Sequence, residues 1–393
     1  MKKVLFYYDN ICHEAAKGGT EVATYRIAKA LKDSEKFEVF NAFRNSTPIK
    51  NNSIYKDIIK LNRNSSEFKR QLSDFIIKND IEIVVNMSRF FRHKLLRKAI
   101  DKSGREVKLI FMQHFAPGSE TKKQTFASGL HLLKLNPFNP LYWLRSSVYP
   151  LIKLPRKISY GKIYRDVYES SDKVVLLSDG YKEDYCRIGG FTDQTKFISI
   201  PNIFEPSDTP KNSTVPKLKR VLILSRMDEI QKRLSLALEI WKRIENDLDL
   251  SDWHLDIVGT GHNKDIVERL IRKKGLTNVT MHGWQNREPF LERDSILMMT
   301  SEYEGQPLTI LEARAYGCVP IAFDSFASLR DLVEPFENGV IVERFGDVDD
   351  FTKKLKDLMY DESYRGELSA NGKASSDRFS AKKIADKWLR ILI

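Results

Sequence analysis

The stretch Ile296–Phe323, ILMMTSEYEGQPLTILEARAYGCVPIAF, decides the fold class of this chain. An apolar run ends near Thr300, a polar loop surrounds Glu304, and a second apolar run follows at Val319–Ala322. Pro307 stands where a helix would begin, a position that proline favours because it has no N–H group to leave unpaired there. Strand, loop, helix and strand in this order predict one unit of a parallel α/β sheet.

The same alternation of strand and helix extends through the whole chain. We expect strands at Lys3–Tyr8, Phe37–Phe40, Ile81–Asn86, Lys108–Gln113, Lys173–Ser178 and Lys196–Ile200, and then at Val221–Ser225, His254–Val258, Val279–His282, Ile296–Thr300, Val319–Ala322 and Val340–Val342. Residues 205–217, EPSDTPKNSTVPK, separate the two series and have the Pro, Ser and Thr content that is typical of a linker. The sequence therefore predicts two Rossmann-like domains, 1–204 and 218–376, facing each other across a cleft.

Composition narrows the class of partner. The chain has 393 residues and a net charge of +12, which favours an anionic partner such as a nucleic acid, a phospholipid surface or a phosphorylated small molecule.

The three cysteines of the chain are far apart in sequence, which argues against a disulfide framework or a zinc site. The first apolar run stops at Asp9, too short for a signal peptide, and no run is long enough for a transmembrane helix. We expect a cytoplasmic protein that is able to rest on a membrane.

Residues 121–165 contain no Asp or Glu, and lysines and arginines alternate there with Trp, Tyr and Leu. Such a mixture suits the interface of an anionic membrane. An ordinary helical insertion, with its apolar side packed on the first domain, explains the stretch equally well. Nucleic acid is disfavoured, because a groove that follows phosphates is mainly charged and this stretch is strongly apolar.

Glu304 and Glu312 are the first candidates for chemistry. One lies in the predicted loop and the other in the predicted helix, with seven residues between them, so the two carboxylates are too far apart to share a proton. Each can instead accept hydrogen bonds from hydroxyls at opposite ends of an extended ligand. The start of the helix between them offers unpaired N–H groups, which suit a diphosphate.

A second candidate element is Val221–Arg233, VLILSRMDEIQKR. Arg226 follows a predicted strand, and Lys232 stands near the start of the next helix. Two cations in such a place can neutralise a diphosphate without a metal ion. Arg233 can take the place of Lys232, and an exposed basic helix start is the alternative without function.

Together these elements resemble the retaining glycosyltransferases of the large family 4, which have the GT-B fold. Their motif is close to S-x-Y/F-E-G-F-x-L-x-x-L-E-A-x-A-x-G-x-P-V-I. The matching residues are Ser301, Glu304, Gly305, Leu308, Leu311, Glu312, Ala313, Ala315, Gly317, Pro320 and Ile321. Gln306 stands where the family usually has an aromatic or apolar residue, and Val319-Pro320 replaces the commoner order Pro-Val.

The resemblance implies a role for each matching side chain. Glu304 would contact the hydroxyls of the donor hexose, Glu312 the hydroxyls of the nucleotide ribose, and the Arg226 and Lys232 pair the donor diphosphate. The loop residues Gly305, Gln306, Pro307 and Leu308 would bind the donor as well. A terminal helix within residues 377–393 would pack back onto the first domain.

Two weaker elements of the second domain resemble the same family. Gly259 belongs to LDIVGTG, which lacks the third glycine and the acidic residue of a dinucleotide site and resembles instead the family's V-G-x-G turn near the nucleotide. Trp284 follows a segment that resembles the family's N-V-x-F-x-G strand, so it would border the base; packing in the core is the equal alternative.

Two elements of the first domain also resemble the family. Gly18 and Gly19 open a G-G-x-E segment that would face the donor phosphates and the acceptor, whereas the alternative is a flexible turn with Thr20 as helix N-cap. His114 follows a predicted strand and would contact the donor sugar near the reacting carbon, unless it is a hydrogen-bonded structural histidine.

The resemblance thus implies a retaining hexosyltransferase that uses a UDP- or GDP-linked sugar, no metal and no cofactor. Its acceptor would be a hydroxyl of a glycan or a lipid-linked glycan, as in the assembly of bacterial-type surface polysaccharides or glycolipids. Asp347-Val348-Asp349 fits a metal-binding pattern but lies in a late predicted loop, so we do not assign a metal to it. The other hypotheses are a polyanion or nucleic-acid binding protein, and a catalytically idle GT-B partner of another transferase.

Overall fold

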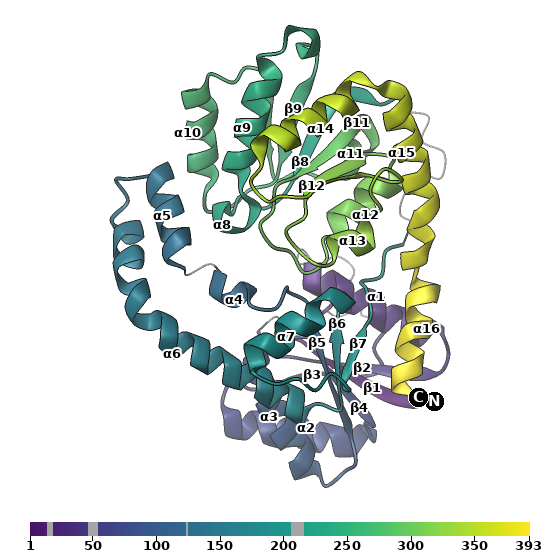
Figure 1. Ribbon diagram of the computed structural model, residues 1–393. Helices are drawn as coiled ribbons and strands as arrows, with labels where there is room; N and C mark the ends of the chain where they lie inside the picture. Colours follow the sequence, from purple (N-terminus) through teal and green to yellow (C-terminus); the bar gives the residue numbers. More distant parts are fainter. Residues whose placement is uncertain (14–18, 46–53, 123–124, 206–215) are drawn as a thin grey trace. The chain divides into compact units, whose positions relative to one another are not determined.

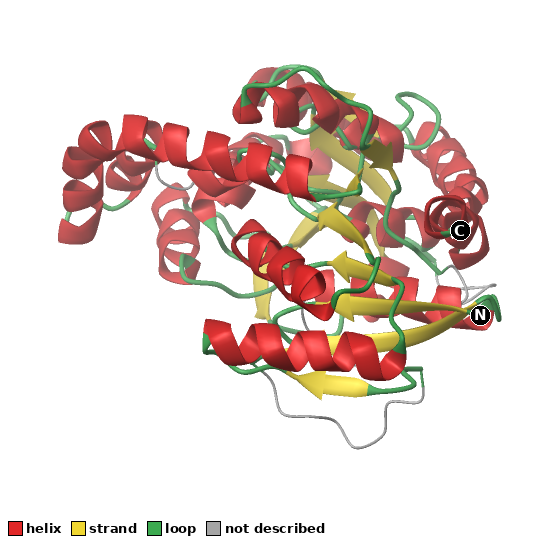
Figure 2. Cartoon of the chain, turned by 90° about the horizontal axis from the view of Figure 1, so that it is seen from below, coloured by secondary structure: helices red, strands yellow, loops and turns green. Residues whose placement is uncertain are grey.

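The computed structural model describes residues 1–13, 19–45, 54–122, 125–205 and 216–393 (Figure 1). The chain divides into two compact units. Unit 1 comprises Met1–Gly118, Pro155–Ile203 and Arg378–Ile393, and unit 2 comprises Ser119–Leu154 and Phe204–Asp377. Each unit contains one parallel sheet with helices packed against it, which confirms the predicted α/β class. Figure 2 shows the helices in red and the strands in yellow.

Unit 1 has a seven-stranded sheet in the order β3-β2-β1-β4-β5-β6-β7. The strands are β1 (Lys2–Tyr7), β2 (Phe37–Phe43), β3 (Ile58–Lys60), β4 (Ile83–Asn86), β5 (Lys108–Gln113), β6 (Lys173–Leu176) and β7 (Phe197–Ser199). The sequence predicts all of these except β3. That edge strand has only three residues, all partly or fully exposed, so it leaves no apolar pattern to detect.

Several helices of unit 1 pack against this sheet. They are α1 (Gly19–Asp33), α2 (Ser65–Asn79), α3 (His93–Ser103), α7 (Lys182–Gly189) and α16 (Ala381–Leu392), with short 3₁₀ turns at Phe90–Arg92 and Asp179–Tyr181. The apolar faces of α2 and α3 close a core around Leu5 and Val84. The terminal helix α16 packs against α1 and buries Trp388 completely. Lys2 Nζ donates a hydrogen bond of 3.0 Å to the carbonyl of Ile393, so the first strand and the last residue of the chain lie together.

Unit 2 has a six-stranded sheet in the order β10-β9-β8-β11-β12-β13. The strands are β8 (Leu218–Leu224), β9 (His254–Val258), β10 (Val279–Gly283), β11 (Asp294–Met299), β12 (Val319–Phe323) and β13 (Val340–Val342). In both sheets the order of the strands reverses, between β1 and β4 in unit 1 and between β8 and β11 in unit 2. Ligands of such sheets bind at this reversal, beyond the carboxyl ends of the strands.

The helices of unit 2 bury its largest aromatic side chains. They are α4 (Ser119–Lys122), α5 (Phe126–Leu135), α8 (Glu229–Lys232), α9 (Leu234–Glu245), α10 (Lys264–Lys274), α11 (Glu288–Arg293), α12 (Leu308–Ala315), α13 (Leu329–Leu332), α14 (Val348–Tyr360) and α15 (Glu362–Ala374), with 3₁₀ turns at Leu248–Leu250 and Ser375–Phe379. Trp241 and Trp253 are almost wholly buried in a core that β8, β9 and β11 share with α9 and α14.

The acid-free stretch, residues 121–165, includes the last two residues of α4, all of α5 and most of α6 (Pro140–Ser170), the long helix in Figure 1. The sequence assigns the whole stretch to the first domain, whereas residues 119–154 group with unit 2. The reason is apolar contact, because Leu132 of α5 packs against Ile230 of α8 and Ile266 of α10. None of the helices within the described ranges is both long and apolar enough to cross a membrane.

Candidate functional site

The candidate residues of unit 2 lie in the loops that follow β8 and β11, the two strands at the reversal of strand order. Arg226 follows β8, and α8 continues from it to Lys232. Glu304 follows β11, and Glu312 lies on α12. The two loops also bond to each other through the backbone, since Glu302 N donates to the carbonyl of Gln231 at 2.7 Å. Lys232 and Glu304 are 72 residues apart in sequence, yet they are in contact. Their two motifs therefore form one site.

Lys232 and Glu304 are the centre of this site. Lys232 Nζ lies 2.5 Å from Glu304 Oε1, and the exposed fractions of the two side chains are only 15% and 10%. The other carboxylate oxygen, Oε2, accepts a hydrogen bond of 3.2 Å from Gln231 Nε2. Both oxygens of Glu304 are thus held in a fixed orientation by donors from α8.

The neighbouring basic residue has a different partner. Arg233 Nε donates to Glu302 Oε2 at 2.7 Å, and the backbone of Arg233 is left-handed with φ of 51°. Thr300 Oγ1 donates to the carbonyl of Lys232 at 2.9 Å. These contacts turn the chain between α8 and α9 so that Lys232, and not Arg233, meets Glu304.

Arg226 is an exposed cation of the site. Its guanidinium donates to Gln231 Oε1 at 3.1 Å and lies 3.6 Å from Asp228 Oδ2. Ser225, directly before it, has a buried hydroxyl with no hydrogen-bond partner in the described part of the chain. Gln231 therefore links Arg226 to Glu304, and a cation remains open to an anionic ligand at the end of β8.

Glu312 is nearly buried on α12 and is paired with an arginine that the sequence did not reveal as a site residue. Arg287 lies 2.9 Å from Glu312 Oε1 through its guanidinium and is about half exposed. It stands at the N-cap of α11, in the loop that begins at Trp284. No sequence motif includes Arg287, because it reaches Glu312 through a contact between segments that are distant in sequence.

The loop between Glu304 and α12 is fixed by its own contacts. Ser328 Oγ donates to the carbonyl of Gly305 at 2.7 Å. Gln306 and Pro307 are buried, Pro307 is the N-cap residue of α12, and Leu308 is its first residue. The predicted helix start at Pro307 is thus confirmed to within one residue.

Gly259 has a structural explanation that its motif did not provide. Its φ is 135°, and a Cβ atom there would lie 2.0 Å from the carbonyl oxygen of Ser225. Gly261 is equally constrained, with Met227 O 2.5 Å from the place of a Cβ. The two glycines let the loop after β9 lie against the loop that carries Arg226.

Trp284 lies at the end of β10 and is 68% exposed, so the alternative that it packs in the core is wrong. The late Asp-Val-Asp pattern has structural partners. Asp347 accepts a hydrogen bond from Asp350 N at the start of α14, and Asp349 pairs with Arg243.

In unit 1, His114 stands directly after β5. Its Nε2 atom is buried and has no hydrogen-bond partner among the described residues. Burial lowers the pKa of His114 to about 4, so the imidazole is neutral near pH 7. His93 has the contacts expected of a structural histidine, because its two ring nitrogens contact Asn86 and Ser171. His114 differs from it at Nε2.

Of the glycine pair, only Gly19 is among the described residues. Gly18 lies outside them, and Gly19 is the exposed first residue of α1. Thr20 is the second residue of α1 and therefore is not the N-cap that the alternative required. Glu21 accepts a hydrogen bond of 3.0 Å from Asn10 Nδ2.

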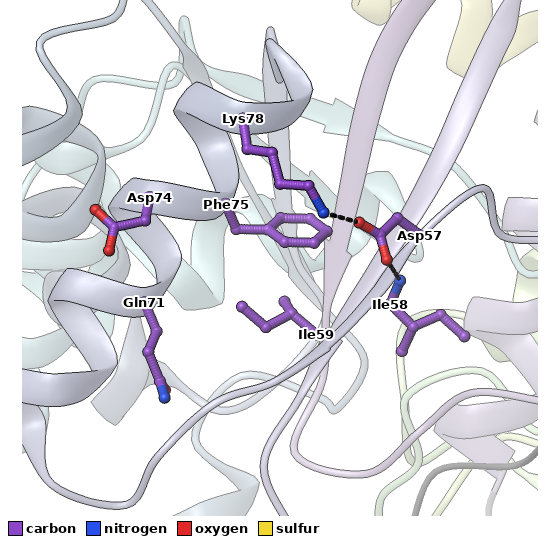
Figure 3. Close-up of a pocket in the computed structure, with 7 residues that line it drawn as sticks. All are labelled: Asp57, Ile58, Ile59, Gln71, Asp74, Phe75 and Lys78. Atoms are coloured by element: carbon purple, nitrogen blue, oxygen red, sulfur yellow. Dashed lines mark hydrogen bonds and ion pairs between the residues drawn. The ribbon is translucent and has the colours of Figure 1, made fainter.

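A hollow of about 440 Å³ lies elsewhere in unit 1, between β3 and α2 (Figure 3). Lys78 Nζ donates to Asp57 Oδ2 there at 3.1 Å, and Phe75 and Ile59 form its apolar side. None of the residues that the sequence singled out lines it, so it is separate from the candidate site.

Part of the chain is similar in sequence to known proteins. Residues 206–375 match the family model described as "Glycosyl transferases group 1". An "Uncharacterized glycosyltransferase" of Haemophilus influenzae is 26% identical over 224 residues, 56% of this chain and 61% of that protein. The "Poly(ribitol-phosphate) alpha-N-acetylglucosaminyltransferase" of Staphylococcus aureus is 26% identical over 239 residues, 59% of this chain and 47% of that protein. The chain thus aligns with about half of the length of these relatives.

The solved structure of "lipopolysaccharide outer core galactosyltransferase WaaB apo form" matches with a TM-score of 0.70, at 18% identity, over 99% of this chain and 98% of that one. Likeness at this identity concerns the fold, and it confirms the predicted GT-B class. The motifs at Arg226, Lys232, Glu304 and Glu312 all lie within the segment 206–375, which matches the model of the family Glycosyl transferases group 1.

Proposed function

We propose that the protein is a retaining glycosyltransferase that moves a hexose from a nucleoside-diphosphate sugar to a hydroxyl acceptor. The observation that carries this proposal is the contact of Lys232 and Gln231 with Glu304 at the carboxyl ends of β8 and β11. A carboxylate whose two oxygens are already oriented can accept hydrogen bonds from sugar hydroxyls at little further cost in entropy. The match of residues 206–375 to the model of the family Glycosyl transferases group 1 supports the same activity.

The donor diphosphate is assigned to Arg226, Lys232 and the start of α12, with the loop Gly305–Leu308 beside it. When the bond from the anomeric carbon to the diphosphate breaks, negative charge develops on the departing oxygen, and these groups stabilise it. Their positive charge meets this need without a metal ion. The acceptor hydroxyl forms the new bond on the side that the diphosphate leaves, and a diphosphate oxygen takes its proton.

The remaining donor contacts follow from the motif positions. Glu312 accepts hydrogen bonds from the ribose hydroxyls, Trp284 borders the base, and Gly259 lets the backbone approach the nucleotide. By its motif, Gly19 of unit 1 is assigned to the donor phosphates. His114 bonds to the donor sugar through Nε2, which supports the proposal because this buried atom has no partner in the described residues. UDP- and GDP-sugars are the proposed donors.

The acceptor is proposed to be a glycan, free or lipid-linked, that the enzyme meets at the cytoplasmic face of a membrane. We define the α6 surface as Phe138, Leu141, Trp143, Leu144 and Val148, all of which are exposed, Phe138 to 90%. It lies within residues 121–165, where every charged residue is Lys or Arg. Exposed apolar side chains among basic ones suit an anionic interface. The related S. aureus protein acts, by its name, on poly(ribitol-phosphate), a polyanion that a basic surface would attract.

A thermal-shift screen tests the donor assignment. A ligand that binds only the folded protein raises its stability, by about 2.7 kcal/mol at a hundred times its Kd. UDP- or GDP-sugars should raise the melting temperature of the wild type, and CMP- and ADP-sugars should raise it less. The opposite result would be that no nucleotide sugar raises the melting temperature, while RNA binds and its affinity falls steeply with salt concentration. That result would favour the polyanion-binding hypothesis.

A further inference from the structure

Two helices of the acid-free stretch contact the loops of the candidate site within unit 2. Lys122, at the end of α4, holds its ammonium 5.2 Å from the centre of the Tyr303 ring, next to Glu304 in sequence. His131, on α5, lies 2.9 Å from Glu229 through its Nε2 atom. The sequence offered two explanations for the stretch, a membrane interface and an insertion packed on the first domain, and neither includes these contacts.

Glu229 is an unusual partner, because its carboxylate is completely buried. Its oxygens accept hydrogen bonds from Ser235, through the backbone N at 3.2 Å and through the hydroxyl. His131 Nε2 is the third donor and the one that comes from outside the β8–α9 segment. A buried carboxylate without enough donors is strongly unfavourable, so each of these hydrogen bonds matters to the position of α8.

Apolar packing reinforces this contact. Leu132, next to His131, is buried against Ile230 of α8 and Ile266 of α10, and Leu135 and Tyr142 pack on the same cluster. Helix α8 has only four residues, too short to be stable by itself. Its position must therefore come from what packs against it.

The side chains that hold Glu304 are the last two of this short helix. Gln231 and Lys232 donate to the two oxygens of Glu304, and Glu229, on the same helix, is the residue that His131 contacts. We propose that α5 is a positioning element of the donor site, and that His131, through the buried carboxylate of Glu229, fixes α8 so that Lys232 and Gln231 face Glu304. This inference rests on the proposed function for its kinetic consequence, but its structural part stands on the contacts alone.

The test compares His131→Ala with two other variants. His131→Gln keeps an N–H donor near the position of Nε2, and Lys134→Ala removes an exposed side chain from the same helix. We expect His131→Ala to lower kcat/KM for the donor about tenfold, the loss of one hydrogen bond to a charged group. KM for the acceptor should stay unchanged, His131→Gln should restore most of the loss, and Lys134→Ala should behave as the wild type.

Hydrogen exchange provides a readout that needs no substrate. The amides of Gln231 and Lys232 donate to the carbonyl of Asp228 at 3.2 and 2.7 Å. In His131→Ala they should exchange faster than in Lys134→Ala under conditions where global unfolding is negligible. Equal exchange in both variants overturns the inference, as does a loss of activity that affects donor and acceptor alike or that His131→Gln does not restore. If the wild type turns over no nucleotide sugar, the proposed function fails, and the exchange rates alone then decide the inference.

Discussion

Lys232 Nζ and Glu304 Oε1 lie 2.5 Å apart, and neither side chain is more than 15% exposed. The pair joins the loop after β8 to the loop after β11, the two strands at which the strand order reverses. Lys232 orients this carboxylate, and Gln231 links the same carboxylate to Arg226, so the group can serve both the sugar and the diphosphate of one donor.

Replacing Lys232 with Met should lower kcat by about a hundredfold, the typical effect of removing one group that stabilises developing charge. Arg233→Met is the matched control, because that side chain pairs with Glu302 instead of Glu304. Steady-state kinetics with a labelled nucleotide sugar measure both variants. Equal losses in the two variants would show that Lys232 has no special role.

The two glutamates should differ in what they affect. Glu312→Ala should weaken nucleotide binding about tenfold or more, because it removes a charged acceptor for the ribose hydroxyls. Glu304→Ala should bind the free nucleoside diphosphate as the wild type does and lose turnover. Calorimetric titration with UDP and GDP separates the two effects. A Glu304→Ala variant with normal turnover would remove Glu304 from the site.

Gly259→Ala should destabilise the protein more than Gly346→Ala. Both glycines have a positive φ, 135° and 83°, but only at Gly259 does a Cβ atom meet backbone, 2.0 Å from Ser225 O. The comparison therefore isolates the close approach of the two loops from the strain of the backbone angle. Melting temperatures measure the difference. If Gly346→Ala lowers the melting temperature as much, the loop contact is less tight than described.

The stability of the fold should decrease as pH falls below about 6.5, in part because of His93. Burial lowers the pKa of His93 to about 3. The folded state thus binds its proton less readily than the unfolded state does, and the stability is full above the unfolded pKa and is lost as pH falls toward the folded pKa. His93→Gln should reduce the slope of unfolding free energy against pH by about one proton, about 1.4 kcal/mol per pH unit.

Chemical denaturation at pH 7, 6, 5 and 4.5 measures that slope. An unchanged slope in His93→Gln would contradict the role assigned to its burial.

Binding to anionic vesicles should depend on the α6 surface. Trp143→Ser together with Leu144→Ser should reduce co-sedimentation at least about tenfold, because each large apolar side chain that enters an interface contributes about 1.5–3 kcal/mol. Leu248→Ser is the control, as Leu248 is an exposed leucine of the 3₁₀ turn after α9. Neutral vesicles should bind less than anionic ones. Equal, negligible binding to both kinds would contradict the membrane assignment.

The sequence predicted the sheets well, since buried parallel strands are apolar runs between turn residues. His254–Val258 and Val340–Val342 are confirmed without any shift of their ends. The edge strand β3 was missed because three half-exposed residues have no pattern of their own. The motif around Glu304 could be recognised for the same reason as the strands, because its residues lie close together in sequence.

Contacts between distant segments could not be predicted in this way. Neither the pairing of Arg287 with Glu312 nor that of His131 with Glu229 joins residues that any motif connects. That residues 119–154 group with unit 2, whereas the sequence assigned them to the first domain, has a related reason. The apolar side of α5 was evident in the sequence, but its partner, the small cluster at Ile230 and Ile266, is formed only when the second sheet folds.

The most direct test of the account is transfer from labelled UDP- and GDP-sugars to a membrane extract by the wild type and by Glu304→Gln, which keeps the size of the side chain and removes its charge. We expect a labelled product with the wild type and a loss of about a hundredfold with Glu304→Gln at saturating donor, while the nucleoside diphosphate still protects both proteins from thermal unfolding. Equal product from both proteins, or protection of neither by any nucleotide, would contradict it.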